Sequence, residues 1–395
     1  MAPTRGVTAK EADRMSQAWR LLEREGVDVW IDVTALGGGA AHEVRRALAQ
    51  GEVAGARMGA PRGRSADAIR QACDSLLPLY RRSGGSQGLV SVQPAELTAK
   101  GTEPSESGAG GAPGVEGTPG FAPGAGPGSW VARARALREE IGRPNLVVRI
   151  PVQAADPATL RALFALGIPV EVCRVRSPRQ YGQAATALVA ALDRPRPIPG
   201  DPSGTPVAPV TLVSFISFDL TGLDQRVDAR LDLIGSDEAK ALRGRAGLAA
   251  ARLAHRVHEM TFSSARWGAL AAAGAPEPKQ LWVADAPTPR RSAHYVQELV
   301  TEGTATAMTP AAAHALADAG VVAGDRVWRQ YADAERTLKF LDWFDISVEA
   351  VAAEGATARG GTVLPSPRAA WPAPPVTLAV PAPAAASAAA PAMVP

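Results

Sequence analysis

The sequence predicts a single α/β domain in which eight parallel strands close into a (β/α)₈ barrel of the TIM type. Short β-branched runs alternate with amphipathic helical stretches along most of the 395 residues, a pattern typical of parallel sheets with helical crossovers. Several runs are almost wholly apolar, as strands buried on both faces are. Eight such runs favour a closed barrel over an open doubly wound sheet, which is the second choice.

The predicted elements follow from these runs in chain order. Strands are expected at 27–33, 52–58, 88–93, 145–152, 169–175, 211–218, 280–284 and 303–308, of which 52–58 and 303–308 carry the weaker signal. Helices are expected at 66–80, 157–166, 180–192, 310–319 and, as one long helix, 237–262. In such a barrel the chemistry lies where strands end and loops begin.

Two segments differ from the rest in composition. Residues 101–130 hold 10 Gly and 5 Pro, and residues 365–395 hold 12 Ala and 9 Pro. Neither can bury enough apolar surface to offset its chain entropy, so both are predicted to be disordered. The expected organisation is a barrel over 1–358, with the 101–130 insertion after the third strand, and an Ala/Pro-rich tail over 359–395.

Composition and short motifs exclude several classes of function. A balance of 42 Lys plus Arg against 39 Asp plus Glu gives no electrostatic footprint for nucleic acid. No apolar run approaches ~20 residues, and the charged N-terminus has no signal-peptide core. A cytoplasmic protein without a membrane partner is therefore expected. Two Cys, Cys73 and Cys173, form neither a disulfide scaffold nor a zinc motif, and no metal or cofactor is predicted.

Three generic signals favour ordinary structural roles. The Gly run 37–39 lacks the spacing of a phosphate loop and is interpreted as a flexible connection. His255 and His258, beside Glu259, are expected on a solvent-exposed helix face rather than at a metal site. Cys173 ends a strand, but no His is placed as its base, so a small buried side chain is the better interpretation.

Three longer stretches carry a more specific signal: 143–151 with 165–172, 227–235 with 241–254, and 266–282. Together they resemble the longer bacterial transaldolases, over about 27–344. The resemblance implies a (β/α)₈ barrel that moves a dihydroxyacetone unit between sugar phosphates of the pentose phosphate pathway, without a cofactor. It also implies a Lys on the fourth strand whose amine forms a Schiff base with the ketose.

The catalytic positions of that family are mostly replaced. Where the family has Lys-Ile-Pro, this chain has Arg149-Ile150-Pro151, and a guanidinium stays protonated and is a very poor nucleophile. The family's third-strand Glu is Gln93, and its fifth-strand Asn and Thr are Glu171 and Cys173. Only the first-strand Asp, the family's proton-transfer residue, is retained, as Asp32.

The phosphate-binding positions are altered as well. Asp219 stands where the resemblance implies an Arg, and the family's Ser-Thr-Gly loop has become 284–287, with Asp285 in it. Arg290, with Arg291, is a candidate for the lost cation. Of the five lysines, Lys100 alone is expected near the C-terminal mouth, from the flexible loop after the third strand.

These replacements predict a converted pocket. Arg149 is expected to form a charge-assisted hydrogen bond with Glu171 inside the barrel, near Asp32, Asp219 and Asp285, with Arg57 as a second cation. The hypothesis is a transaldolase-like protein that has lost its catalysis and binds or regulates a partner, with a weakened affinity for sugar phosphate. One alternative is an active transaldolase acting on sedoheptulose 7-phosphate and glyceraldehyde 3-phosphate. Another is repurposed chemistry at Asp32, Glu171 and Cys173.

Overall fold

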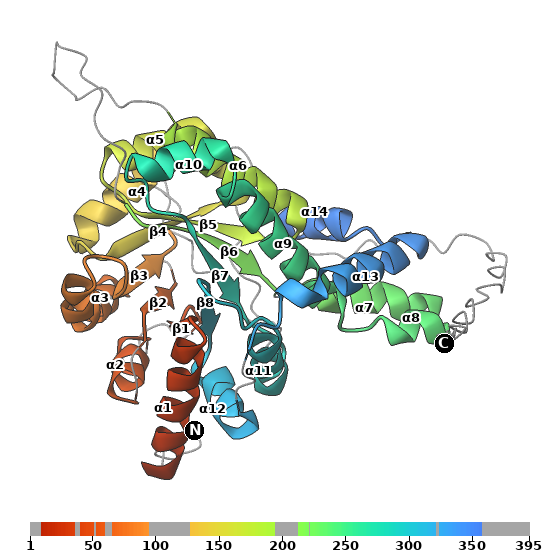
Figure 1. Ribbon diagram of the computed structural model, residues 1–395. Coiled ribbons are helices and arrows are strands. Elements are labelled where there is room, and N and C mark those ends of the chain that lie inside the picture. Colours follow the sequence, from red (N-terminus) through yellow and green to blue (C-terminus); the bar gives the residue numbers. More distant parts are fainter. Residues whose placement is uncertain are drawn as a thin grey trace, which may run out of the picture. The chain divides into compact units, whose positions relative to one another are not determined.

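The computed structural model describes residues 9–35, 40–50, 53–59, 65–94, 127–193, 212–220, 222–320 and 324–357. Within these ranges eight parallel strands pair in sequential order, and the last pairs with the first to close a barrel (Figure 1). Helices cover the outside of the strands. The predicted (β/α)₈ fold is therefore confirmed.

All eight predicted strands are present; seven are shorter than expected by one to three residues, and the seventh in chain order has the expected length but begins one residue earlier. They are β1 (Asp28–Asp32), β2 (Gly55–Met58), β3 (Leu89–Val92), β4 (Leu146–Pro151), β5 (Val170–Val175), β6 (Ser214–Asp219), β7 (Lys279–Val283) and β8 (Ala305–Met308). In register, Arg149 on β4 pairs with Glu171 on β5, and Asp32 on β1 with Arg57 on β2. The charged side chains thus lie at one height of the barrel wall.

The helices that separate the strands begin with α1 before β1 and end with α14 after the last strand. They are α1 (Ala9–Arg24), α2 (Ala40–Gln50), α3 (Ser65–Arg82), α4 (Pro127–Ile141), α5 (Pro157–Ala165), α6 (Pro178–Leu192), α7 (Leu223–Ile234), α8 (Asp237–Ala241), α9 (Ala246–Phe262), α10 (Ala265–Ala272), α11 (Pro289–Glu298), α12 (Pro310–Ala319), α13 (Tyr331–Trp343) and α14 (Val348–Thr357). A short 3₁₀ helix, η3 (Trp328–Gln330), precedes α13.

The prediction of a single long helix over 237–262 is wrong, because the helix is interrupted between α8 and α9. Gly244 has a φ of +68°, in the left-handed region that glycine tolerates. Its N–H donates to Asp228 Oδ1 at 2.8 Å, and a Cβ there would lie 2.4 Å from an Arg291 nitrogen. A helical pattern in the sequence on both sides concealed this turn.

Period-two alternation along the strands divides the barrel interior into layers. The layer near the N-terminal ends is apolar and includes Trp30, Leu89, Val147, Phe215 and Leu281, all buried. Trp30 and Phe215 meet edge to face, with ring centroids 5.0 Å apart. This apolar floor closes the barrel from below, so the polar layer above it opens only toward the C-terminal ends.

Several predictions fall on residues outside the described ranges: the Gly run 37–39, Lys100, insertion residues 101–126 and the tail 359–395. The last four residues of the predicted insertion, 127–130, instead begin α4, and Trp130 is 3% exposed. Burial of this one large aromatic side chain is enough to order a Gly/Pro-rich stretch locally. None of the helices in the described ranges is long and apolar enough to cross a membrane.

The prediction of a solvent-exposed face at His255 and His258 is also wrong. Both imidazoles on α9 are buried, at 7% and 9% exposure, against α6 and β7. Each ring finds a hydrogen-bonding partner on a neighbouring element, which allows a polar group to be buried without penalty. Of the three residues singled out on this helix, Glu259 alone is exposed.

Candidate functional site

A layer of charged side chains fills the barrel directly above its apolar floor. Asp32, Arg57, Arg149 and Glu171 come from strands β1, β2, β4 and β5, at positions that alternate with outward-facing apolar residues. Arg57, Arg149 and Glu171 are buried, and the Asp32 side chain is 12% exposed. Two guanidiniums and two carboxylates therefore share one enclosed volume with balanced charge.

Arg57 is the centre of this layer. One guanidinium nitrogen lies 2.6 Å from Asp32 Oδ2, and another lies 3.1 Å from Glu171 Oε1. Although burial opposes its charge, the carboxylates of Glu171 and Asp32 raise the pKa of Arg57 above its usual value. Burial likewise favours neutral acids, yet Arg57 and then Arg149 hold the pKa values of both carboxyls below their usual range.

Arg149, at the position implied for the Schiff-base Lys, extends from β4 past β3 to the end of β2. Its guanidinium donates a hydrogen bond to the Met58 carbonyl oxygen at the end of β2. Burial and the neighbouring positive charge of Arg57 lower the pKa of Arg149, while Glu171 and Asp32 oppose that shift. The group remains a cation held by its surroundings, since arginine is effectively always protonated in proteins.

The prediction of a direct hydrogen bond between Arg149 and Glu171 is wrong, because each side chain bonds to other partners. The Glu171 carboxylate instead accepts a hydrogen bond from the Ser91 hydroxyl on β3 and contacts Arg57. Although the two residues are neighbours in strand register, the guanidinium that contacts the carboxylate is that of Arg57 from β2, while Arg149 turns to the Met58 carbonyl. Arg149 acts on Glu171 through charge rather than through contact.

The rim of the mouth holds the remaining candidates. Asp219 ends β6 and pairs with Arg176, 2.8 Å away, just after β5. Asp285 follows β7; burial and the like charges of Asp32 and Asp219 raise its pKa. Gln93 lies half-buried after β3, and Arg290 is exposed on the first turn of α11. Of the predicted candidates, the structure thus brings the two acids to the mouth and leaves Arg290 in solvent.

Cys173 is buried near the top of β5, as the sequence indicates. Burial and the adjacent Glu171 charge raise the pKa of its thiol to about 11. Only thiolates are effective nucleophiles, so this side chain is poorly suited to covalent chemistry at neutral pH.

Arg291 is engaged beside the mouth rather than in it. Its guanidinium lies 2.9 Å from Asp224 Oδ2 and over the ring of Tyr295, at 4.9 Å from the centroid. These residues line a cavity of about 390 Å³ between the loops after β6 and β7, which Asp285 also borders. Arg291 is thus committed to Asp224 and does not replace a phosphate-binding cation at Asp219.

Comparison with known proteins identifies the family to which this barrel is similar. Residues 128–358 match the model of the transaldolase/fructose-6-phosphate aldolase family. The transaldolase of Thermobifida fusca is 35% identical over 287 residues, covering 72% of this chain and 69% of that protein. The transaldolase of a Parafrankia species is 35% identical over 332 residues, covering 81% and 80%.

The chain belongs to the transaldolase/fructose-6-phosphate aldolase family. Another relative, transaldolase 1 of Streptomyces avermitilis, is 32% identical over 285 residues, covering 72% of this chain and 67% of that protein. A solved monomeric variant of dihydrodipicolinate synthase aligns with a TM-score of 0.32 at 12% identity, covering 85% of this chain and 93% of that one.

The described lysines lie away from the C-terminal mouth of the barrel. Lys279 begins β7 at the N-terminal end of the barrel and forms an ion pair with Asp28 there. Lys240 and Lys339 lie on α8 and α13, and Lys10 lies on α1. Among the described residues, no lysine therefore reaches the C-terminal mouth where the family's amine would work. Nor do the described His, Cys, Asp and Glu side chains form a group that could hold a metal ion.

Sequence reasoning missed two members of the site. Ser91 binds Glu171, and a serine on an apolar strand gives little signal by itself. Arg176 lies beyond an irregularity of β5, where Arg174 has a φ of +61° and the register with β6 shifts. Strict alternation along the strand does not predict where a side chain points after such a bulge.

Proposed function

We propose that this protein is a transaldolase-family barrel that has lost Schiff-base catalysis and acts by binding a ligand or a protein partner. The observation that carries the proposal is Arg149. Arg149 stands where the resemblance implies the family's nucleophile, and its guanidinium is buried and donates a hydrogen bond to the Met58 carbonyl. Schiff-base formation needs an amine that can lose its proton, which a guanidinium at this position does not supply.

The surroundings of Arg149 support the same proposal. The family's other polar groups here are exchanged for Gln93, Glu171 and Cys173, and the first of these is an amide that cannot act as a base. The charged layer is internally neutral, with Arg57 bridging two carboxylates. Such an arrangement favours a stable fold over a reactive centre.

A sugar phosphate would be a weakened ligand for this mouth. Asp219 and Asp285 place two carboxylates at the rim, where a phosphate dianion would be repelled. Arg176 is a described cation of the rim, and it is already paired with Asp219. A partner protein or a ligand without a phosphate group is therefore the better candidate.

Reductive trapping tests the proposal. Full-length protein, purified from a host lacking its own transaldolase, is incubated with fructose 6-phosphate and borohydride, and its intact mass is measured. We expect no added mass, and no turnover dependent on erythrose 4-phosphate above a boiled control. The Thermobifida fusca relative, treated in parallel, serves as the positive control for trapping.

An adduct on this chain would contradict the proposal and favour an active transaldolase, the function named for its relatives. Peptide mapping would then locate the amine, with Lys100 the first position to check. Turnover of ~1 s⁻¹ or faster without an adduct would instead favour repurposed chemistry at Asp32, Glu171 and Cys173. The raised pKa of the Cys173 thiol opposes that alternative.

A further inference from the structure

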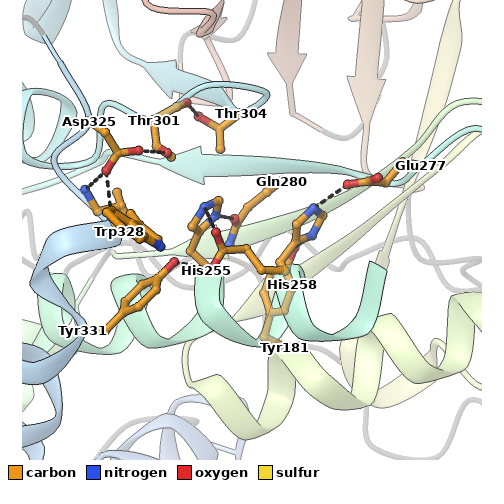
Figure 2. Close-up of polar contacts among 12 residues, drawn as sticks. Tyr181, His255, His258, Glu277, Gln280, Thr301, Thr304, Asp325, Trp328 and Tyr331 are labelled. Atoms are coloured by element: carbon orange, nitrogen blue, oxygen red, sulfur yellow. Dashed lines mark hydrogen bonds and ion pairs between the residues drawn. The ribbon is translucent and has the colours of Figure 1, made fainter. Parts of the chain in front are cut away.

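Two stacked imidazoles lie outside the mouth, on the face of α9 that packs against the barrel (Figure 2). The rings of His255 and His258 are 6.1 Å apart between centroids, with 9° between their planes. The helical spacing i, i+3 places both on one face. Two ionisable rings are thus buried side by side.

His258 is satisfied as a neutral ring. Its Nε2 lies 3.0 Å from a Glu277 carboxylate oxygen, and its Nδ1 lies 2.8 Å from the Tyr181 hydroxyl on α6. Because a carboxylate only accepts, Nε2 carries the proton and Nδ1 accepts from Tyr181. A second proton on this ring would leave the hydroxyl hydrogen of the buried Tyr181 without an acceptor.

His255 can gain a partner when it is protonated. Its Nδ1 donates to Gln280 Oε1 on β7, 2.6 Å away, and its Nε2 lies 3.9 Å from Glu259 Oε1. The other oxygen of Glu259 accepts the Tyr331 hydroxyl of α13 at 2.6 Å. A proton on Nε2 would draw this carboxylate toward the imidazolium and away from Tyr331.

Other ionisable groups surround the pair on every packed element. They are Arg252, Arg256 and Glu259 on α9; Tyr181 on α6; Glu277 before β7; Asp325 and Arg326 before η3; and Tyr331, Asp333 and Glu335 on α13. Arg252 pairs with Glu298 and Arg256 with Glu335. Glu259 is thus the carboxylate placed to pair with a positive charge on His255.

We propose that His255 and His258 form an acid-sensitive latch that takes up one proton, at His255, and releases the N-terminal end of α13 from α9. The proton is assigned to His255 because Glu259 lies beside its Nε2, whereas both nitrogens of His258 already have partners. Burial lowers the pKa of His255, while Gln280 and Glu259 oppose that shift. Release follows from the movement of Glu259, since Tyr331 then loses its acceptor.

The consequence reaches the C-terminal helix. After α13 the chain continues directly into α14, whose Glu349 carboxylate accepts the Arg179 N–H at 3.0 Å and the Ser177 hydroxyl at the start of α6. The latch therefore acts on the segment that caps the helix following β5. Its effect is expected in amide-exchange protection along α13 first and α14 second.

Hydrogen exchange at two pH values tests the latch in the full chain. Burial lowers the pKa of His255 below the ordinary imidazole value, so the two measurements are made at about pH 7 and about pH 5. Between them we expect protection factors of residues 331–337, corrected for intrinsic exchange, to fall about tenfold, while those of α1 and α3 do not. His255→Gln should abolish the fall. The exposed His42 on α2 provides the control, and His42→Gln should leave the fall unchanged.

Two results would overturn the latch: unchanged protection in the wild-type protein, or a full tenfold fall in His255→Gln. If His255→Gln does not fold, Tyr331→Phe decides instead. It removes the hydroxyl that Glu259 holds, so protection of α13 should be low at both pH values. A pH-dependent fall that persists in Tyr331→Phe would contradict the proposal.

Discussion

At the scale of single residues, the buried guanidinium of Arg149 is stabilised by its neighbours. A buried cation without partners would cost several kcal/mol. Here Asp32 and Glu171 provide two carboxylates, Arg57 takes the direct contacts, and Arg149 takes a backbone carbonyl. The layer depends on all four charges together, so losing one affects the others more than an exposed ion pair would.

Replacement of Arg57 should therefore destabilise the fold strongly. Arg57→Met leaves Asp32 and Glu171 buried without their direct cation, with an expected loss of roughly 3–5 kcal/mol of unfolding free energy. Denaturant titration measures it. Arg266→Met is the matched control, since its ion pair with Asp193 is about half exposed and should leave the midpoint near the wild type. Equal midpoints for the two variants would show that the layer is energetically unimportant.

The acid response of the fold should depend on Asp32. Its pKa is lowered in the folded state from about 3.8, so its contribution to stability is fully present above that value. As the pH falls from about 3.8 toward the pKa of Asp32 in the folded state, the unfolded chain binds the proton first, and this contribution to stability is lost. Asp32→Asn should be less stable at neutral pH yet show a shallower loss below pH ~4. An unchanged slope of unfolding free energy against pH would refute the assignment.

At the scale of elements, alternation along strands explains how much the sequence could predict. An inward position on one strand fixes the positions two residues away, so the sequence alone places Arg149, Glu171 and Asp32 in one layer. Which carboxylate meets which guanidinium depends on side-chain reach across strands, so alternation does not predict the central position of Arg57. Similarly, helical periodicity predicted the 237–262 stretch but not its break at Gly244, because that break depends on Asp228 and Arg291 from distant elements.

The contact between α14 and α6 yields a prediction at this scale. Glu349 supplies a negative charge and two acceptor oxygens at the N-terminus of α6, where helix dipole and unpaired N–H groups favour an anion. Glu349→Ala should cost about 1 kcal/mol and increase amide exchange in 348–354. Glu335→Ala, which removes a half-exposed pair with Arg256, should have a smaller effect on both. Equal protection of α14 in the wild type and Glu349→Ala would contradict the capping role.

At the scale of the whole molecule, the barrel of the family is present, with a layer of paired charges above its apolar floor. The barrel closes in the same sequential order around an apolar floor of Trp30 and Phe215. The floor packs through its own apolar side chains, so this fold can hold a layer of ion pairs above it. The site alone therefore determines function, as is general for this fold.

Restoring one residue should accordingly not restore activity. In Arg149→Lys the new ammonium would face Asp32 and Glu171, two carboxylates that favour its charged form and oppose the loss of the proton that nucleophilic attack requires. Asp219 would still repel a phosphate dianion, and Gln93 would still be unable to act as a base. We expect no borohydride-trapped adduct with fructose 6-phosphate.

A combined variant separates these causes. Adding Gln93→Glu, Glu171→Asn and Cys173→Thr to Arg149→Lys returns the family's groups and removes one of the two carboxylates facing the amine. If the layer of charges prevents Schiff-base formation, the combined variant should trap an adduct that Arg149→Lys alone does not. Circular dichroism and denaturant titration confirm that each protein is folded before its mass is compared. Trapping by the single variant would contradict this role of the charged layer and show that an amine at position 149 is sufficient for Schiff-base formation.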